Sequence, residues 1–146
     1  MAEPLSITAS IIALLQLTSK VVKYLNNASS ASKDSSRILI ELGSVNGYLL
    51  ILEDLVGRAD GGETSLCTVR SLGVPYGPLA QFKSTLERLA KHLEPVFGIK
   101  KAGKVLRWPF KKDEVTDMIF ALERQKAFFI LAMENDQMQL SMASLN

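Results

Sequence analysis

The residues of this chain that are able to carry out catalysis are few and scattered. It contains one cysteine, Cys67, and one histidine, His92, and neither lies in a motif for nucleophilic catalysis. We expect Cys67 to be a small packing residue near a loop, and His92 to be hydrogen-bonded or exposed to solvent. Three carboxylates at the start of one predicted helix lack the cysteine or histidine partners of a metal site: Asp113, Glu114 and Asp117. Neither the P-loop nor the dinucleotide-binding glycine spacing occurs, so the sequence predicts no enzyme, no cofactor and no metal.

Basic residues concentrate in one segment that also carries aromatic side chains. The run from Gly98 to Lys112 (GIKKAGKVLRWPFKK) has no acidic residue, and six basic residues lie within thirteen positions. Each basic side chain near anionic lipid contributes about 1 kcal/mol, and tryptophan favours the membrane–water interface. We expect anionic lipid to contact Lys100, Lys101, Lys104, Arg107, Trp108, Lys111 and Lys112. Three other interpretations stay open: an acidic protein partner, a solvated loop whose Trp108 closes the end of a bundle, and, as a minor option, nucleic acid.

The N-terminal run from Pro4 to Ser19 carries no charged side chain, which is unusual for a surface helix. Its sixteen residues would form a helix about 24 Å long, slightly short of the ~30 Å hydrocarbon core of a bilayer. Extended to Leu25, the run is long enough to span a bilayer, with Lys20 and Lys23 reaching toward the headgroups. The residues expected to enter a membrane are Glu3, Leu5, Ile7, Ile11, Ile12, Leu14, Leu15 and Leu17. A helix wholly buried in a bundle is the alternative, and we expect it to describe the resting state.

Helical periodicity runs through the whole chain, and no strand pattern is present. The first predicted helix has one apolar face, formed by Ile7, Ile11, Leu14, Thr18, Val21, Val22 and Leu25. The second, from about Lys33 to Val56, has an unbroken apolar face of Ile38, Leu42, Val45, Leu49, Leu52 and Val56. Five glycines and Pro75 then indicate a long loop over residues 57–77.

Two further helices complete the predicted pattern. One begins at Pro78, presents Leu79, Phe82, Leu86, Leu89 and Leu93, and is expected to end at Pro95. The last begins after Lys112 and presents Val115, Ile119, Leu122, Phe129 and Met133, interrupted by Lys126. The fold class predicted is all-α, a four-to-five-helix bundle with a long loop between the second and third main helices.

Length and composition set limits on the class of protein. At 146 residues, with 47% hydrophobic and 22% charged residues, the chain suits a single globular domain over residues 1–146. Its net charge of +2 is too small to indicate a nucleic-acid-binding protein. A single cysteine cannot form an internal disulfide, and the N-terminus lacks the basic start of a secretory signal, so a cytoplasmic location is expected.

Several segments together point to a family. Between Glu3 and Gln137 the chain contains, in this order, PLSITASIIALLQLTSKVVKYLN, LVGRA, SLGVPYGPLAQFKSTLERLAKHL, GKVLRWPFKKDEV and ERQKAFF. With these segments it resembles the HeLo-like N-terminal domain of fungal STAND (NLR-like) receptors. Such domains are related to the HeLo and mixed-lineage-kinase-like four-helix bundles, which are thought to execute regulated cell death at membranes.

The resemblance implies a function that composition does not. It implies a non-enzymatic effector domain that self-associates, inserts its N-terminal helix into anionic membranes and moves there from the cytoplasm on activation. In that family an acidic residue near the start of the helix is emphasised, and Glu3 is the matching position. The resemblance also implies a NACHT or NB-ARC module following in the same chain. The alternative is a soluble adaptor that only binds proteins, or a structural cap on a receptor.

Overall fold

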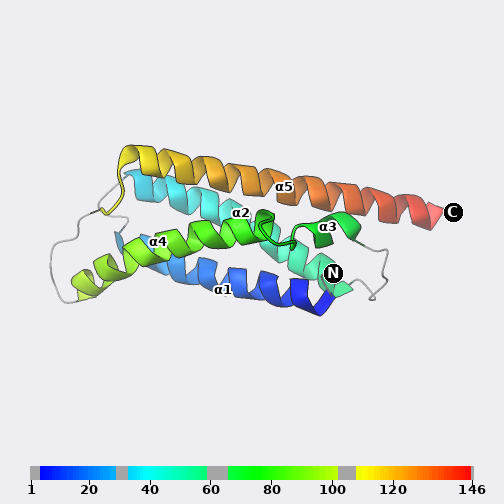
Figure 1. Ribbon diagram of the computed structural model, residues 1–146, viewed down its shortest axis with the longest axis horizontal. Coiled ribbons are helices and arrows are strands. Elements are labelled where there is room, and N and C mark those ends of the chain that lie inside the picture. Colours follow the sequence, from blue (N-terminus) through cyan, green and yellow to red (C-terminus); the bar gives the residue numbers. More distant parts are fainter. Residues whose placement is uncertain (1–3, 29–32, 59–65, 102–107, 146) are drawn as a thin grey trace.

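The computed structural model describes residues 4–28, 33–58, 66–101 and 108–145. Side chains at 4–6, 27–28, 95–101 and 143–145 are outside that description. Within it the fold is all-α, as predicted, with no strand (Figure 1). The helices are α1 (Pro4–Ala28), α2 (Lys33–Arg58), the short α3 (Cys67–Ser71), α4 (Pro78–Lys101) and α5 (Lys112–Leu145).

The four long helices form a bundle in which α1 and α5 lie on one diagonal. Helix α1 packs against α2 and α4, and α5 packs against the same two helices. In Figure 1, α1 and α4 run in one direction while α2 and α5 run in the other. The connection from α2 to α4 therefore has to cross the other diagonal of the bundle. This crossing explains why the chain needs a long segment between these two helices.

The core is formed by the helix faces that the periodicity predicts. All six predicted positions on α2 are buried, as are all five on α4 and the five on α5. On α1 the prediction holds for every position except Val22, which is only partly buried. Lys126, which interrupts the α5 face, is partly buried, and its Nζ lies 3.4 Å from Oε2 of Glu41 on α2. Leu122 of α5 belongs to the same core as the α1 face, but α5 lies diagonally opposite α1 and is not one of the two helices that pack closely against it.

Two expectations about helix boundaries are wrong. Helix α4 does not end at Pro95 but continues to Lys101. Proline lacks only its own backbone donor and crowds the preceding turn, so a helix that is already formed continues through it at a cost. The second error concerns residues 57–77, which were predicted to be loop throughout: α2 extends to Arg58, and Cys67–Ser71 form α3. Cys67 is exposed rather than packed.

Helix α3 is held by a side chain from the far end of the sequence. Its N-terminal neighbour Leu66 has left-handed backbone angles and provides no side-chain cap. Instead Asp136 of α5, only 4% exposed, accepts hydrogen bonds from the backbone N–H of Thr68 at 3.2 Å and of Val69 at 2.6 Å. A carboxylate on the first backbone N–H groups of a helix satisfies donors that the helix itself cannot. Asp136 therefore fixes the crossing segment to α5.

Candidate membrane-contact surfaces

The apolar face of α1 is part of the bundle core. Ile7, Ile11 and Leu14 are at most 3% exposed, so three of the residues expected to enter a membrane are covered by α2 and α4. The polar Thr18 is buried on the same face, and its hydroxyl donates to the backbone oxygen of Leu14 at 2.7 Å. This bond satisfies the hydroxyl without a second helix. The hydroxyl of Thr18 therefore adds little to the cost of transferring this part of the α1 core face to another apolar environment.

The outer side of α1 is exposed but uncharged. Ile12 is 40% exposed, whereas Leu15 and Leu17 are partly buried against the core. The other exposed positions up to Ser19 carry small or amide side chains: Ala9, Ser10, Ala13, Gln16 and Ser19. The first cation is Lys20, whose Nζ lies 5.8 Å from the centre of the Tyr24 ring. Of the remaining expected residues, Glu3 lies outside the described residues, and only the backbone of Leu5 is described.

The basic segment is described only in part. Lys100 and Lys101 end the backbone of α4, but their side chains, like all of Lys104 and Arg107, lie outside the described residues. Lys111 and Lys112 are exposed where α5 begins. Of the basic residues expected to contact lipid, only Lys111 and Lys112 therefore have described side chains, and both side chains are exposed.

Trp108 belongs to the closed end of the bundle rather than to an exposed loop. It is partly buried against the core, and its ring packs edge-on to Phe110 at 5.4 Å between centroids. Phe110 in turn contacts the ring of His92, which is exposed on α4, at 5.1 Å. The indole Nε1 of Trp108 is buried and has no hydrogen-bond partner among the described residues. This placement agrees with the interpretation in which Trp108 closes the end of the bundle, and part of its side chain stays exposed.

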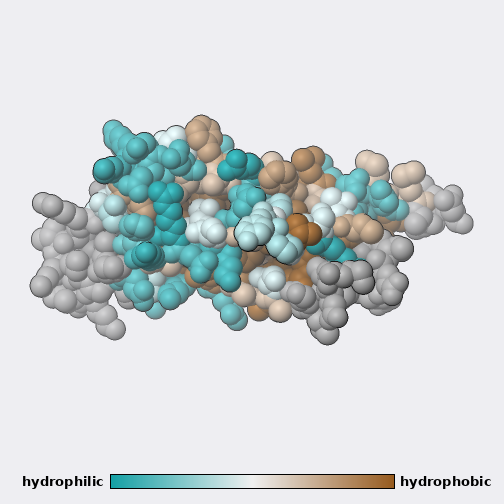
Figure 2. Space-filling view, in the orientation of Figure 1, coloured by the Kyte–Doolittle hydropathy of each residue, from teal (hydrophilic) through white to brown (hydrophobic). Residues whose placement is uncertain are grey.

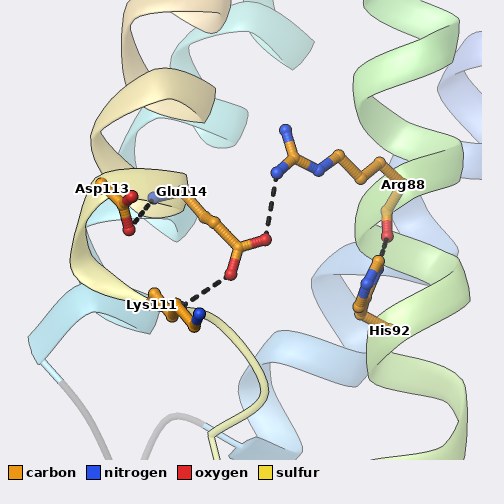
Figure 3. A network of polar contacts seen from close by, with 5 residues as sticks. All are labelled: Arg88, His92, Lys111, Asp113 and Glu114. Carbon is orange, nitrogen blue, oxygen red and sulfur yellow. Dashed lines mark hydrogen bonds and ion pairs between the residues drawn. The ribbon is translucent and has the colours of Figure 1, made fainter.

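A polar network fixes the start of α5 against α4 (Figure 3). Arg88 donates to Oε2 of Glu114 at 3.1 Å, and the backbone N–H of Lys111 donates to Oε1 of the same carboxylate at 3.1 Å. The backbone N–H of Glu114 donates to Asp113 at 3.1 Å. The hydrogen bond from Lys111, together with Arg88, lowers the pKa of Glu114 below its usual range. These bonds hold Lys111 and Lys112 at a defined place on the bundle.

Helix α5 has an apolar surface that the sequence analysis did not identify. Besides its core face, it exposes six large apolar side chains: Phe120, Phe128, Leu131, Met138, Leu140 and Met142. Phe120, Leu131 and Met138 lie within about 20° of one another around the helix at 100° per residue. We call these three residues the α5 outer stripe. The sequence carries part of this signal, because the three residues share one side of a helix at 100° per residue, but their exposure follows only from the packing of the bundle.

Hydropathy is distributed unevenly along the bundle. In Figure 2 the half where α5 begins is mainly hydrophilic, and hydrophobic side chains gather over the middle and toward the other half. The second half contains the uncharged part of α1 and the C-terminal part of α5 (Figure 1). The described part of the face shown in Figure 2 is therefore polarised along the long axis of the bundle.

Comparison with known proteins identifies no relative, since no family model, no curated protein and no solved structure matches this chain. Within the described ranges, no group of histidine, cysteine or acidic side chains is arranged to hold a metal ion. None of the helices, over the residues described, is both long and apolar enough for a membrane crossing.

Proposed function

We propose that this chain is a non-enzymatic effector domain that binds anionic membranes, self-associates and inserts α1 into the bilayer. The observation that carries the proposal is the character of α1, which has no charged side chain on any side from Ile7 to Ser19. Surface helices of globular proteins normally carry charges on their solvent side. A helix without them loses little on entering lipid, and in the resting state its core face packs in the bundle. The likeness to HeLo-like cell-death domains supports the same function.

Because the core face of α1 is buried in the bundle, removing α1 from the bundle costs free energy, and this cost limits insertion. Exposing its core face to water costs about 25 cal/mol per Å² of apolar surface, so α1 leaves the bundle only for another apolar environment. Anionic lipid supplies that environment, and the basic residues, Lys111 and Lys112 among them, bring it close. Clustering of several copies raises their local concentration and favours association.

Vesicle experiments test this proposal. The protein is mixed with liposomes with and without anionic lipid, and co-sedimentation and dye release are measured. Leakage that requires anionic lipid supports the proposal, and folded protein that neither binds nor releases dye contradicts it. Replacing Lys100, Lys101 and Lys104 by Glu tests the electrostatic part without touching the described core, and unchanged binding would refute that part.

A matched pair of variants tests the role of α1. Ile12→Asp and Ile40→Asp each place a charge at an exposed isoleucine, 40% exposed on α1 and 71% exposed on α2. We expect Ile12→Asp to reduce dye release at least about tenfold, because burying a charge in lipid is expensive. Ile40→Asp is expected to release dye like the wild type. Equal release by both variants would mean that the outer side of α1 does not meet the bilayer.

A protein-binding adaptor is the second candidate, and the α5 outer stripe favours it. Exposed apolar side chains that follow one helix face are typical of helix-mediated protein association. In this function α1 stays in the bundle, and α5 binds a partner or a second copy. Concentration-dependent association without any lipid binding would favour the adaptor over the membrane effector.

A further inference from the structure

A groove lies between α1, the turn after α3 and the start of α4, and part of the outer side of α1 lines it. Its volume is about 520 Å³, which is within the range of about 300–1,000 Å³ typical of small-molecule sites. The space exists because small side chains line it, namely Ala9 and Ala13 on α1 and Ala80 on α4. Leu17 and Val74 form apolar walls. We call this hollow the α1–α4 groove.

One cation interrupts the apolar lining. Among the described residues, Lys83 is the only charged one that lines the groove, and it forms no ion pair with any of them. It follows Leu79 by one turn of α4, and α4 runs parallel to α1 (Figure 1). From Ala80 to Lys83, α4 therefore runs in the same direction as α1 from Ala9 to Leu17. An apolar channel with a single unpaired cation at one side complements a molecule with one anionic head and an apolar chain.

We propose that the α1–α4 groove binds a fatty acid, with the carboxylate at Lys83 and the hydrocarbon chain along Ala9, Ala13 and Ala80. A single cation matches a singly charged head, and the uncharged lining accepts methylene groups. Because the groove is shared by two helices, a bound chain contacts α1 and α4 together. The ligand thereby stabilises the docked position of α1. Its regulatory consequence rests on the proposed function, whereas the binding of the fatty acid does not depend on that function.

Calorimetry with the whole chain and laurate, kept below its micelle concentration, tests the binding site. The wild type is expected to bind one laurate saturably, and Lys83→Gln to bind it about tenfold more weakly or worse. Lys91→Gln, a change at another exposed lysine of α4, is the matched control and is expected to bind like the wild type. Uncharged dodecanol is expected to bind wild type and Lys83→Gln equally. Equal laurate affinity in wild type and Lys83→Gln would overturn the assignment of the carboxylate to Lys83.

Filling the groove tests its location. Ala80→Phe and Ala13→Leu add bulk from α4 and from α1 at exposed positions, so one of them remains informative if the other fails to fold. Each is expected to abolish binding of laurate and dodecanol while circular dichroism stays unchanged. Binding that survives in folded forms of these variants, or no saturable binding to the wild type, would overturn the proposal.

Hydrogen exchange separates this proposal from the proposed function. Laurate is expected to slow exchange of the α1 amides from Thr8 to Leu17, and no slowing in protein saturated with laurate would contradict stabilisation of α1. Dye release is measured without fatty acid, so failed leakage with intact laurate binding refutes only the membrane function. Failed laurate binding with intact leakage refutes only the groove.

Discussion

Helices α1 and α5 distribute their apolar residues in opposite ways. On α1 the large apolar side chains are mostly turned into the core, and Ile12, 40% exposed, is the only exposed large hydrophobic residue among its described side chains. On α5 a complete core face coexists with the α5 outer stripe and three further exposed apolar side chains. The helix with the most apolar sequence therefore exposes less apolar surface than the helix with a mixed sequence.

This difference distinguishes two roles of apolar residues, packing in the core and contact with a membrane or partner, which composition alone does not distinguish. Apolar residues at a core spacing stabilise the bundle, whatever else they do. The uncharged outer side of α1 costs little to transfer to lipid, whereas the α5 outer stripe is already exposed and available to a partner. Under the proposed function, we therefore expect α1 to contribute stability and insertion, and α5 to contribute association.

The largest expected effect concerns the core. Leu14→Ala on α1 should lower the free energy of unfolding by about 2–5 kcal/mol, because Leu14 is 3% exposed and its removal leaves a cavity. The same substitution at Leu131 on α5, which is 62% exposed, should change it by about 0.5 kcal/mol or less. Urea denaturation measures both. Similar losses of unfolding free energy in the two variants would contradict the difference in apolar burial between α1 and α5.

The next effect concerns the attachment of α3 to α5. Asp136→Ala should cost about 1–3 kcal/mol of unfolding free energy, because it leaves two backbone N–H groups of α3 without their acceptor. Glu134→Ala, at an exposed acidic position two residues earlier, is the control and should have little effect. An Asp136→Ala protein as stable as the control would show that α3 does not depend on this carboxylate.

A smaller effect is expected on self-association. Leu131→Lys combined with Met138→Lys places two like charges on the α5 outer stripe, and we expect the dissociation constant of the oligomer to rise about tenfold. Analytical ultracentrifugation over a concentration series measures it. Ile12→Lys, on α1, should leave association in solution unchanged. If Ile12→Lys weakens association and the α5 variant does not, the roles of the two helices are reversed.

The smallest effect is electrostatic. Glu114, at the start of α5, has a lowered pKa, so its interactions stabilise the fold above the ordinary glutamate pKa and are lost as the pH falls through the folded value. Glu114→Gln should therefore lower Tm slightly at pH 7, by less than Asp136→Ala does, and the difference should vanish in acid. Thermal unfolding of both proteins from pH 7 down into acid measures this difference in Tm. A difference that grows in acid would contradict the expectation that Glu114 stabilises the fold in its charged form.

Local patterns were sufficient to predict the core but not the arrangement of the helices. The regular spacing from Ile38 to Val56 predicts the buried face of α2, because burial on a helix repeats with its turn. The same spacing contains no information on which helices are neighbours. It also could not predict α3, since a five-residue helix depends on Asp136, which is 67 residues from Val69 in the sequence.

The candidate site was predicted less completely. The absence of charge on α1 could be read directly, but the partial burial of Trp108 depends on its contact with Phe110 and the core. The α1–α4 groove arises where three segments meet, so no single stretch of sequence indicates it. The exposure of Leu131 and Met138 requires knowing which side of α5 the bundle covers.

The central claim is that α1, not α5, enters the membrane. Its most direct test replaces Cys67, the single cysteine, by Ala and attaches an environment-sensitive fluorophore to a new cysteine at Ile12 or at Met138. On addition of anionic vesicles, we expect the emission of the label at position 12 to shift to the blue and that at position 138 to stay as in water. A label at 12 that remains water-like, with or without a shift at 138, would contradict insertion of α1.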